Sequence, residues 1–231
     1  MKKTELNLSP IGIVKFFIGI IFILFLLNDF AIYIQYFTDW KYVNTFIRLV
    51  NVDLEMNIPT LYSSCSMIFA SILLAITAAL EKKQGCAYLA WYGLSFIFFF
   101  LALDEATELH EMLVTPLRAT LNTSGAFYFA WVIPYAMLVV LFLLCYIRFL
   151  IRLPNRFTAL FIISGFVYVA GALIFELIGG EIASIYGVDT LIYAVSYTIE
   201  EFLEMLGIVL LIYTVSSYIK FKNKSITLNW I

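Results

Sequence analysis

Six apolar segments, each long enough to cross a lipid bilayer, dominate this sequence. A bilayer core about 30 Å thick needs roughly 20 apolar residues per helix. Hydrophobic residues make up 63% of the 231 residues and charged residues 13%, whereas a soluble domain is about half apolar and a quarter charged. The sequence therefore predicts one all-α membrane domain over residues 1–231. Its transmembrane helices are expected at residues 11–36, 60–80, 86–112, 125–147, 157–178 and 190–218.

A shorter amphipathic helix is predicted at residues 41–51, between the first two transmembrane helices. Val43, Phe46, Ile47 and Val50 follow the i, i+3, i+4, i+7 spacing of one helix face. Polar and basic residues fall between them, as in helices that lie flat at a membrane interface. The first apolar segment is too long for a signal peptide and lacks a small-x-small cleavage site, so it is interpreted as a membrane helix.

The basic residues predict the orientation. Placing the N-terminus in the cytoplasm puts eleven of the 14 Lys and Arg residues inside, and only Lys41, Arg48 and Arg118 outside. This arrangement agrees with the positive-inside rule at every short loop. Both termini are therefore expected in the cytoplasm, and the plasma membrane is the expected location.

The acidic residues are distributed in the opposite way. With this orientation, Glu5 and Glu81 are the inner acids and the other fourteen lie in the outer half or beyond it. Because the positive-inside rule depends on Lys and Arg, topology does not explain these acids. Asp39, Asp53 and Glu55 in the first outer loop are interpreted as solvated side chains.

Nine candidate ligands lie near the outer ends of the third, fifth and sixth transmembrane helices. At 1.5 Å per residue, the acids of the three helices reach nearly the same level, about 24–31 Å from the inner basic residues. Helical spacing predicts that Asp104, Glu108 and Glu111 share one stripe. The candidate metal ligands are Asp104, Glu105, Glu108, His110, Glu111, Glu176, Glu200, Glu201 and Glu204.

Carboxylates gathered in a membrane need compensation by cations, shared protons or water. Oxygen-rich ligands favour hard ions such as calcium, magnesium or manganese, and one histidine among carboxylates also suits iron. The Glu-x-x-His pairs of di-iron bundles are absent from the sequence, and three cysteines with one histidine disfavour zinc. The sequence therefore predicts a site for a divalent metal ion, with iron, manganese, calcium or magnesium favoured over structural zinc.

Three functions follow from this pattern. The first is a metal-dependent membrane enzyme that acts on a hydrophobic substrate at an outward-facing site. The second is a divalent-cation or proton-coupled transporter or channel, and the third is a non-catalytic subunit of a membrane complex. Transporter sites tend to lie near the bilayer midplane, and the inner half offers no second polar position, which favours the enzyme. The expected partners are the bilayer and a cation or small hydrophobic substrate, while the net charge of −2 indicates no nucleic-acid partner.

Glycines suggest where helices pack and end. Gly165 and Gly171 are interpreted as positions of close helix packing. Gly179 and Gly180 are expected to end or break the fifth helix beside Glu176.

Overall fold

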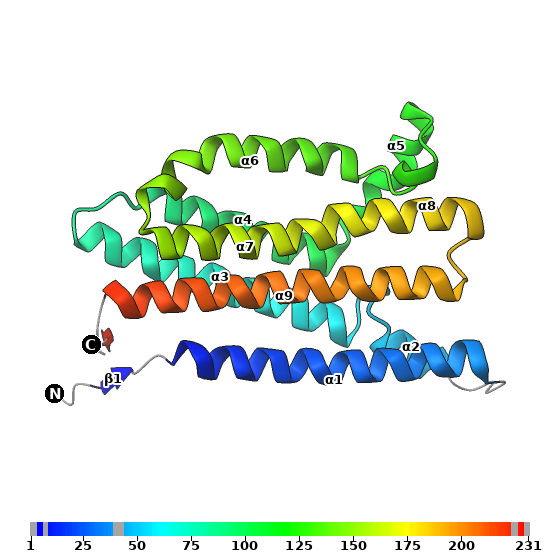
Figure 1. Cartoon of the computed structure of the whole chain (residues 1–231), viewed down its shortest axis with the longest axis horizontal. Helices are drawn as coiled ribbons and strands as arrows, with labels where there is room; N and C mark the ends of the chain where they lie inside the picture. Colours follow the sequence, from blue (N-terminus) through cyan, green and yellow to red (C-terminus); the bar gives the residue numbers. More distant parts are fainter. Residues whose placement is uncertain (1–3, 7–8, 39–43, 223–225, 229–231) are drawn as a thin grey trace.

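The fold is a bundle of long helices that lie side by side along one axis (Figure 1). The computed structural model describes residues 4–6, 9–38, 44–222 and 226–228. Six of its helical runs are long and apolar enough to cross a membrane, so the predicted all-α, multi-span membrane bundle is confirmed. They are α1 (Pro10–Phe37), α3 (Ile58–Lys83), α4 (Leu89–Thr107), α6 (Val132–Arg152), the continuous run Asn155–Tyr186, and α9 (Leu191–Lys222).

Shorter elements join these helices. The run Asn155–Tyr186 consists of α7 (Asn155–Val169), the π-helical turn η3 (Ala170–Phe175) and α8 (Glu176–Tyr186). The other helical elements are α2 (Asn44–Val50), η1 (Glu111–Leu113), α5 (Val114–Leu121) and η2 (Gly125–Phe127). Two short strands, β1 (Thr4–Leu6) and β2 (Ile226–Leu228), pair antiparallel with Thr4 opposite Leu228.

The strand pair places the first and last described residues of the chain, in β1 and β2, at the same end of the bundle, while α5 lies at the opposite end (Figure 1). These are called the terminal end and the α5 end below. Several basic residues that predicted the orientation lie in the last turns of α6 and α9, at the terminal end of the bundle. They include Arg152, Lys220 and Lys222. Lys2, Lys3, Lys224, Lys41 and Asp39 lie outside the described residues.

Local sequence explains where the first helices begin. The Ser9 side chain accepts a hydrogen bond from the amide of Gly12 at 3.3 Å, and Pro10 occupies the first turn. Asn57 caps α3 in the same way through the amide of Thr60, at 3.1 Å. Both patterns satisfy amides that the first helical turn leaves without partners. The predicted starts of these two helices, at residues 11 and 60, are therefore close to the observed ones.

Two predicted boundaries are wrong. The helix expected at residues 86–112 ends at Thr107, because Glu108 adopts a left-handed conformation with φ of 56° that stops the helix. The helix expected at residues 125–147 begins only at Val132 and continues to Arg152. Hydropathy does not detect the late start of α6, since residues 125–131 are mostly apolar.

The expected break at Gly179 and Gly180 is also wrong, because the helix continues to Tyr186. Gly180 instead permits a close contact, since a Cβ atom there would lie 2.9 Å from the carbonyl oxygen of Ala126. The irregularity falls earlier, in η3, directly before Glu176. Such π-helical turns often occur at functional sites.

The amphipathic helix predicted at residues 41–51 corresponds to α2, with residues 41–43 outside the described part of the chain. Phe46 of α2 makes an edge-to-face ring contact with Phe30 of α1, at 6.0 Å between ring centroids. The helix is therefore held against the bundle by aromatic packing.

The helix α9 forms the centre of the bundle, in contact with α1, α3, α7, η3 and α8. The terminal half has an apolar core in which Trp91 packs against Tyr218 and Phe161, at 4.8 and 5.7 Å between ring centroids. At its edge, buried Glu81 pairs with Lys222 at 3.0 Å and accepts a hydrogen bond from the Tyr218 hydroxyl at 2.8 Å. The core of the terminal half is therefore mainly apolar and aromatic, with one buried ion pair at its edge.

Candidate functional site

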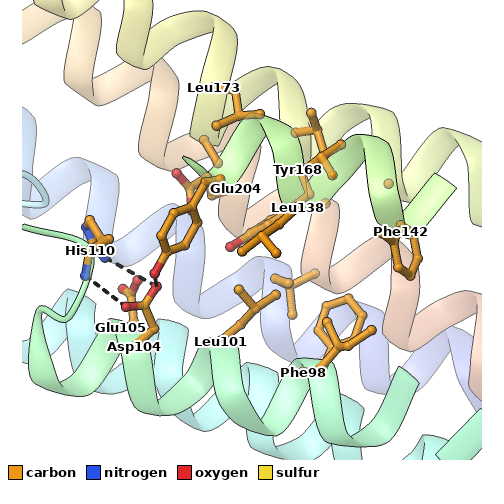
Figure 2. A pocket seen from close by; sticks show the side chains of 18 of the residues that line it. Phe98, Leu101, Asp104, Glu105, His110, Leu138, Phe142, Tyr168, Leu173 and Glu204 are labelled. Carbon is orange, nitrogen blue, oxygen red and sulfur yellow. Dashed lines mark hydrogen bonds and ion pairs between the residues drawn. The ribbon is translucent and has the colours of Figure 1, made fainter. Parts of the chain in front are cut away.

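A cavity of about 770 Å³ lies between α4, α6, the α7–η3–α8 run and α9. Much of its wall is apolar, and Figure 2 shows Phe98, Leu138 and Phe142 on the side of the cavity away from His110. Asp104, Glu105, His110 and Glu204 gather toward the opposite side of the view (Figure 2). The cavity therefore joins an apolar compartment to an acidic one inside the membrane-spanning bundle.

The acidic compartment carries most of the candidate ligands. Its acidic and histidine residues come from the loop after α2, from α4 and the turn that follows it, and from α8 and α9. They are Asp53, Glu55, Asp104, Glu105, His110, Glu111, Glu176, Glu200, Glu201 and Glu204. None of the described lining residues is Lys or Arg. Arg118, the nearest outer basic residue in the sequence, lies over the Tyr128 ring at 4.0 Å instead.

Asp104 connects three segments of the chain. One of its carboxylate oxygens accepts a hydrogen bond from the His110 amide at 3.0 Å, and the other accepts one from the Tyr135 hydroxyl at 2.9 Å. The second oxygen also lies 3.4 Å from Nδ1 of His110. This arrangement depends on the left-handed residue Glu108, which turns the chain back after α4 and places His110 beside Asp104.

The surroundings of His110 make it the positive group of this compartment. Burial lowers the pKa of His110, but the hydrogen bond and charge of Asp104 outweigh burial, and Glu111 and Glu55 add to them, so the pKa rises to about 9. Nε2 of His110 lies 3.9 Å from both Glu55 and Glu111. The imidazole is thus protonated at neutral pH and partly compensates the acids around it.

The loop acids Asp53 and Glu55 hold their protons more tightly than ordinary carboxyl groups. Burial raises the pKa of Asp53 to about 6, although a hydrogen bond from Tyr193 acts in the opposite direction. Burial, with repulsion from Glu105, raises the pKa of Glu55 to about 8. Groups with such pKa values can exchange protons near neutral pH, as general acids and bases must.

Trp131 links the His110 region to Glu176. Its indole N–H donates a hydrogen bond to Glu176 at 2.8 Å, while its ring contacts His110 at 4.8 Å between centroids. The carboxyl groups of Glu176 and Glu200 are within hydrogen-bonding distance of each other. Side chains of the α6 N-cap, α8 and α9 therefore join in one polar network beside the cavity.

Glu105, Glu201 and Glu204 line the cavity without a hydrogen-bond partner among the described residues. Backbone packing brings Glu204 this deep into the bundle. A Cβ atom at Gly171 would lie 2.8 Å from both the Glu200 carbonyl oxygen and Cγ of Glu204. The predicted role of Gly171 in close packing is confirmed, whereas that of Gly165 is wrong, because nothing lies within 4 Å of a Cβ atom there.

Eight of the nine predicted site residues line this cavity, and Glu108 does not. The predicted stripe of Asp104, Glu108 and Glu111 is wrong, because α4 ends before the last two. Among the residues that the structure describes, no group of three or more His, Cys, Asp or Glu side chains has the geometry to hold a metal ion. The acids share one cavity wall, but their present side-chain positions do not form a ligand set.

Sequence reasoning missed Asp53 and Glu55, which it interpreted as solvated. The loop that carries them is fixed by Asn28 of α1, whose Oδ1 accepts from the Val52 amide at 3.1 Å and whose Nδ2 donates to Thr198 at 3.1 Å. The Tyr193 hydroxyl then donates to Asp53 at 3.2 Å. A sequence signal for an ordered loop was present in Asn51 and Asn57, which flank the two acids.

Comparison with known families shows which family the chain belongs to, but the description of that family names no activity. A family model described as "Domain of unknown function (DUF8692)" matches residues 16–218, which cover all or most of every transmembrane run and the whole cavity wall. The chain belongs to this family. No curated protein and no solved structure matches it significantly. Function in this DUF8692 member must therefore be argued from the cavity itself.

Proposed function

We propose that this protein is a membrane-embedded enzyme that acts on a hydrophobic substrate and uses a divalent cation bound by its cavity carboxylates. The observation that carries the proposal is the two-part cavity, apolar on one side and acidic on the other. A hydrophobic molecule can occupy the apolar part while its reactive group meets the carboxylates. In the bilayer, such a site has direct access to lipid-soluble molecules.

The charge balance supports a bound cation. Nine carboxyl groups line the cavity with His110 and with no described Lys or Arg. Unpaired carboxylates in a low-dielectric interior are costly, so they must be protonated or compensated by a cation. Carboxylate oxygens are the ligands that hard divalent ions prefer, and a metal-bound water or substrate oxygen would be activated for reaction.

Glu105, Glu201 and Glu204 are the acids best able to adjust to such an ion. Because they have no hydrogen-bond partner among the described residues, their rotation breaks no existing bond. Asp104 is already oriented by His110 and Tyr135. We therefore assign Asp104 as the fixed ligand and the three glutamates as side chains that close around the ion.

The distribution of polar groups favours an enzyme over a transporter. Beyond the acidic compartment the lining is mostly Leu, Phe and Ile, and Ser164 is one of its few polar members. A pathway for ions would need further polar positions toward the terminal end. The cavity is better suited to hold a hydrophobic chain than to conduct a cation.

Elemental analysis of the purified protein in lipid nanodiscs tests the proposal. Near-stoichiometric Fe, Mn, Ca or Mg is expected in the wild type, with most of it lost in Glu204→Gln. The matched control is Glu181→Gln, since Glu181 is exposed on α8 and does not line the cavity. This control should retain the metal.

A wild-type protein that binds no metal, with an unchanged melting temperature in Glu204→Gln, would contradict the metal proposal. Metal retention together with divalent-ion flux into liposomes would instead favour transport. Loss of metal in both variants would show that the effect of Glu204→Gln is not specific to the cavity.

A further inference from the structure

The cavity opens sideways toward the lipid. Phe96 of α4, Leu141 of α6 and Phe166 of α7 all line it, yet these side chains are 70%, 56% and 67% exposed. Their exposed surfaces face the region that lipid chains occupy around a membrane bundle. The cavity wall is thus continuous with the lipid-facing surface on three neighbouring helices.

The helix α6 forms the loosest part of this wall. Val132, at its start, is its one fully buried residue. The closest backbone approach of α6 to a transmembrane helix is to α7, and it reaches α4 through side chains such as Phe149, which packs on Trp91. Hydrogen bonds hold its two ends, from Tyr135 to Asp104 at the α5 end and from Tyr146 to the Ala90 carbonyl toward the terminal end. Between these points, the wall can admit a molecule from the bilayer without breaking a hydrogen bond that the structure shows.

The cavity volume limits what can enter. About 770 Å³ is within the range of roughly 300–1,000 Å³ typical of small-ligand sites. The apolar part is formed by side chains such as Phe98, Leu138 and Phe142, which suit a hydrocarbon chain. A single-chain amphiphile fits this shape, with its chain among these residues and its head group in the acidic compartment.

The acidic compartment selects the head group. Carboxylates accept hydrogen bonds and cannot donate them when ionised, whereas an ammonium group supplies three donors and a positive charge. The Trp131 and Tyr135 rings beside His110 add surfaces that attract cations. A phosphate or carboxylate head would carry the same sign of charge as every ionised carboxyl group of this wall, and no described Lys or Arg lines the wall to bind it.

We propose that the substrate is a long-chain amine, which enters the cavity from the bilayer past α6 and places its amine beside Glu176, which Trp131 contacts, and Glu200, neither of which is assigned to the metal. This inference rests on the proposed function in one respect, that the cavity holds a hydrophobic substrate. It does not depend on which metal is bound. It names the chemical class of the substrate and the direction from which it arrives.

Photolabelling in liposomes tests this proposal directly. Three probes with the same 16-carbon chain and a mid-chain diazirine would be compared, carrying an amine, an alcohol or a carboxylate head. The amine should label peptides of α6 and α7 about tenfold more strongly than the carboxylate, the selectivity that ~1.4 kcal/mol gives. Unlabelled hexadecylamine should compete, which tests the wild-type protein without any substitution.

Two leucine substitutions separate cavity binding from surface labelling. Gly165 lines the cavity and has nothing within 4 Å of a Cβ position, so Gly165→Leu fills the apolar part without a backbone clash. Gly19 of α1 has the same open space but does not line the cavity, which makes Gly19→Leu the matched control. Gly165→Leu should reduce amine labelling several-fold, and Gly19→Leu should not.

Three other labelling results would each overturn a different part of the proposal. Cavity labelling by the carboxylate or alcohol at the level of the amine would overturn the amine assignment and leave the hydrophobic-substrate proposal intact. Labelling that neither Gly165→Leu nor hexadecylamine reduces would show surface contact and overturn entry into the cavity. Absence of cavity labelling with all three probes would overturn this inference and the proposed hydrophobic substrate together.

Discussion

His110 contacts Asp104 only because α4 ends at Thr107 and Glu108 turns the chain back. An uninterrupted helix would have rotated His110 about 100° from Glu111 and kept it off the stripe of Asp104. The same turn removes Glu108 from the cavity wall. A single backbone conformation thus decides which of the predicted side chains can act together.

The shifted pKa values of His110 and Glu55 should make the stability of the protein depend on pH. The pKa of His110 rises from 6.5 to about 9 and that of Glu55 from 4.5 to about 8, so the folded protein binds both protons more tightly than the unfolded chain. The stability that these two groups contribute is then fully present below their unfolded-state pKa values and is lost as pH rises through the folded-state values. In metal-free protein, the melting temperature should therefore fall between pH 6.5 and 9.

The variant Glu55→Gln should flatten this fall. It removes one titrating group and also a charge that raises the pKa of His110. Melting temperatures of chelator-treated protein in nanodiscs at closely spaced pH values would measure the effect. A wild-type melting temperature that stays constant over this range would contradict the contacts described for His110 and Glu55.

At the scale of elements, the contact of α7 and η3 with α9 determines how deep the acids lie. Gly171 and Gly207 let the two backbones approach closely, and a Cβ atom at Gly207 would lie only 2.6 Å from the backbone nitrogen of Tyr168. Glu204 is on the same helix, one turn before Gly207. Small residues at such contacts are typical of membrane helix pairs.

The variant Gly207→Ala should destabilise the bundle by about 1–3 kcal/mol, because the new methyl group meets backbone that cannot rotate away. Gly165→Ala is the matched control on α7. It meets nothing within 4 Å and should be neutral or stabilising by up to about 1 kcal/mol, through the better helix propensity of alanine. Unfolding titrations in detergent would compare the two, and equal effects would contradict the packing role of Gly207.

At the scale of the whole molecule, β1 and β2 show that the described ends of the chain meet at one end of the bundle. Basic residues of α3, α6 and α9 lie at that end, at the last turns of these helices. The positive-inside rule then predicts that the terminal end is cytoplasmic and that the acidic compartment lies nearer the outer surface. The two ends of the bundle are also unlike in their cores, with aromatic packing at one and carboxyl groups at the other.

Labelling with a membrane-impermeant maleimide should test this orientation. Cys86 is exposed in the loop between α3 and α4, and Val188 is exposed in the loop between α8 and α9. In a chain with Cys65 and Cys145 replaced by alanine, Cys86 should react only after the cells are permeabilised. With Cys86 also replaced, Val188→Cys should react in intact cells, and the reverse pattern would contradict the predicted orientation.

Local sequence was enough to predict the membrane class and the approximate positions of the six transmembrane runs. It also predicted that acids gather near one level. Hydropathy over about 20 residues reports burial in lipid, and helical rise converts spacing into depth. These properties depend on neighbours in the chain. Eight of the nine predicted residues reached the cavity wall for this reason.

Tertiary structure decided which acids share the cavity and what surrounds them. Asp53 and Glu55 belong to it because Asn28 bonds the Val52 amide of their loop and also Thr198, which lies 170 positions after Asn28 in the sequence. Glu108 is excluded by one left-handed residue conformation, and the apolar compartment is enclosed by side chains of α4, α6, α7 and α9. Such contacts join residues that are distant in the chain, so no local pattern of hydrophobicity or charge contains them.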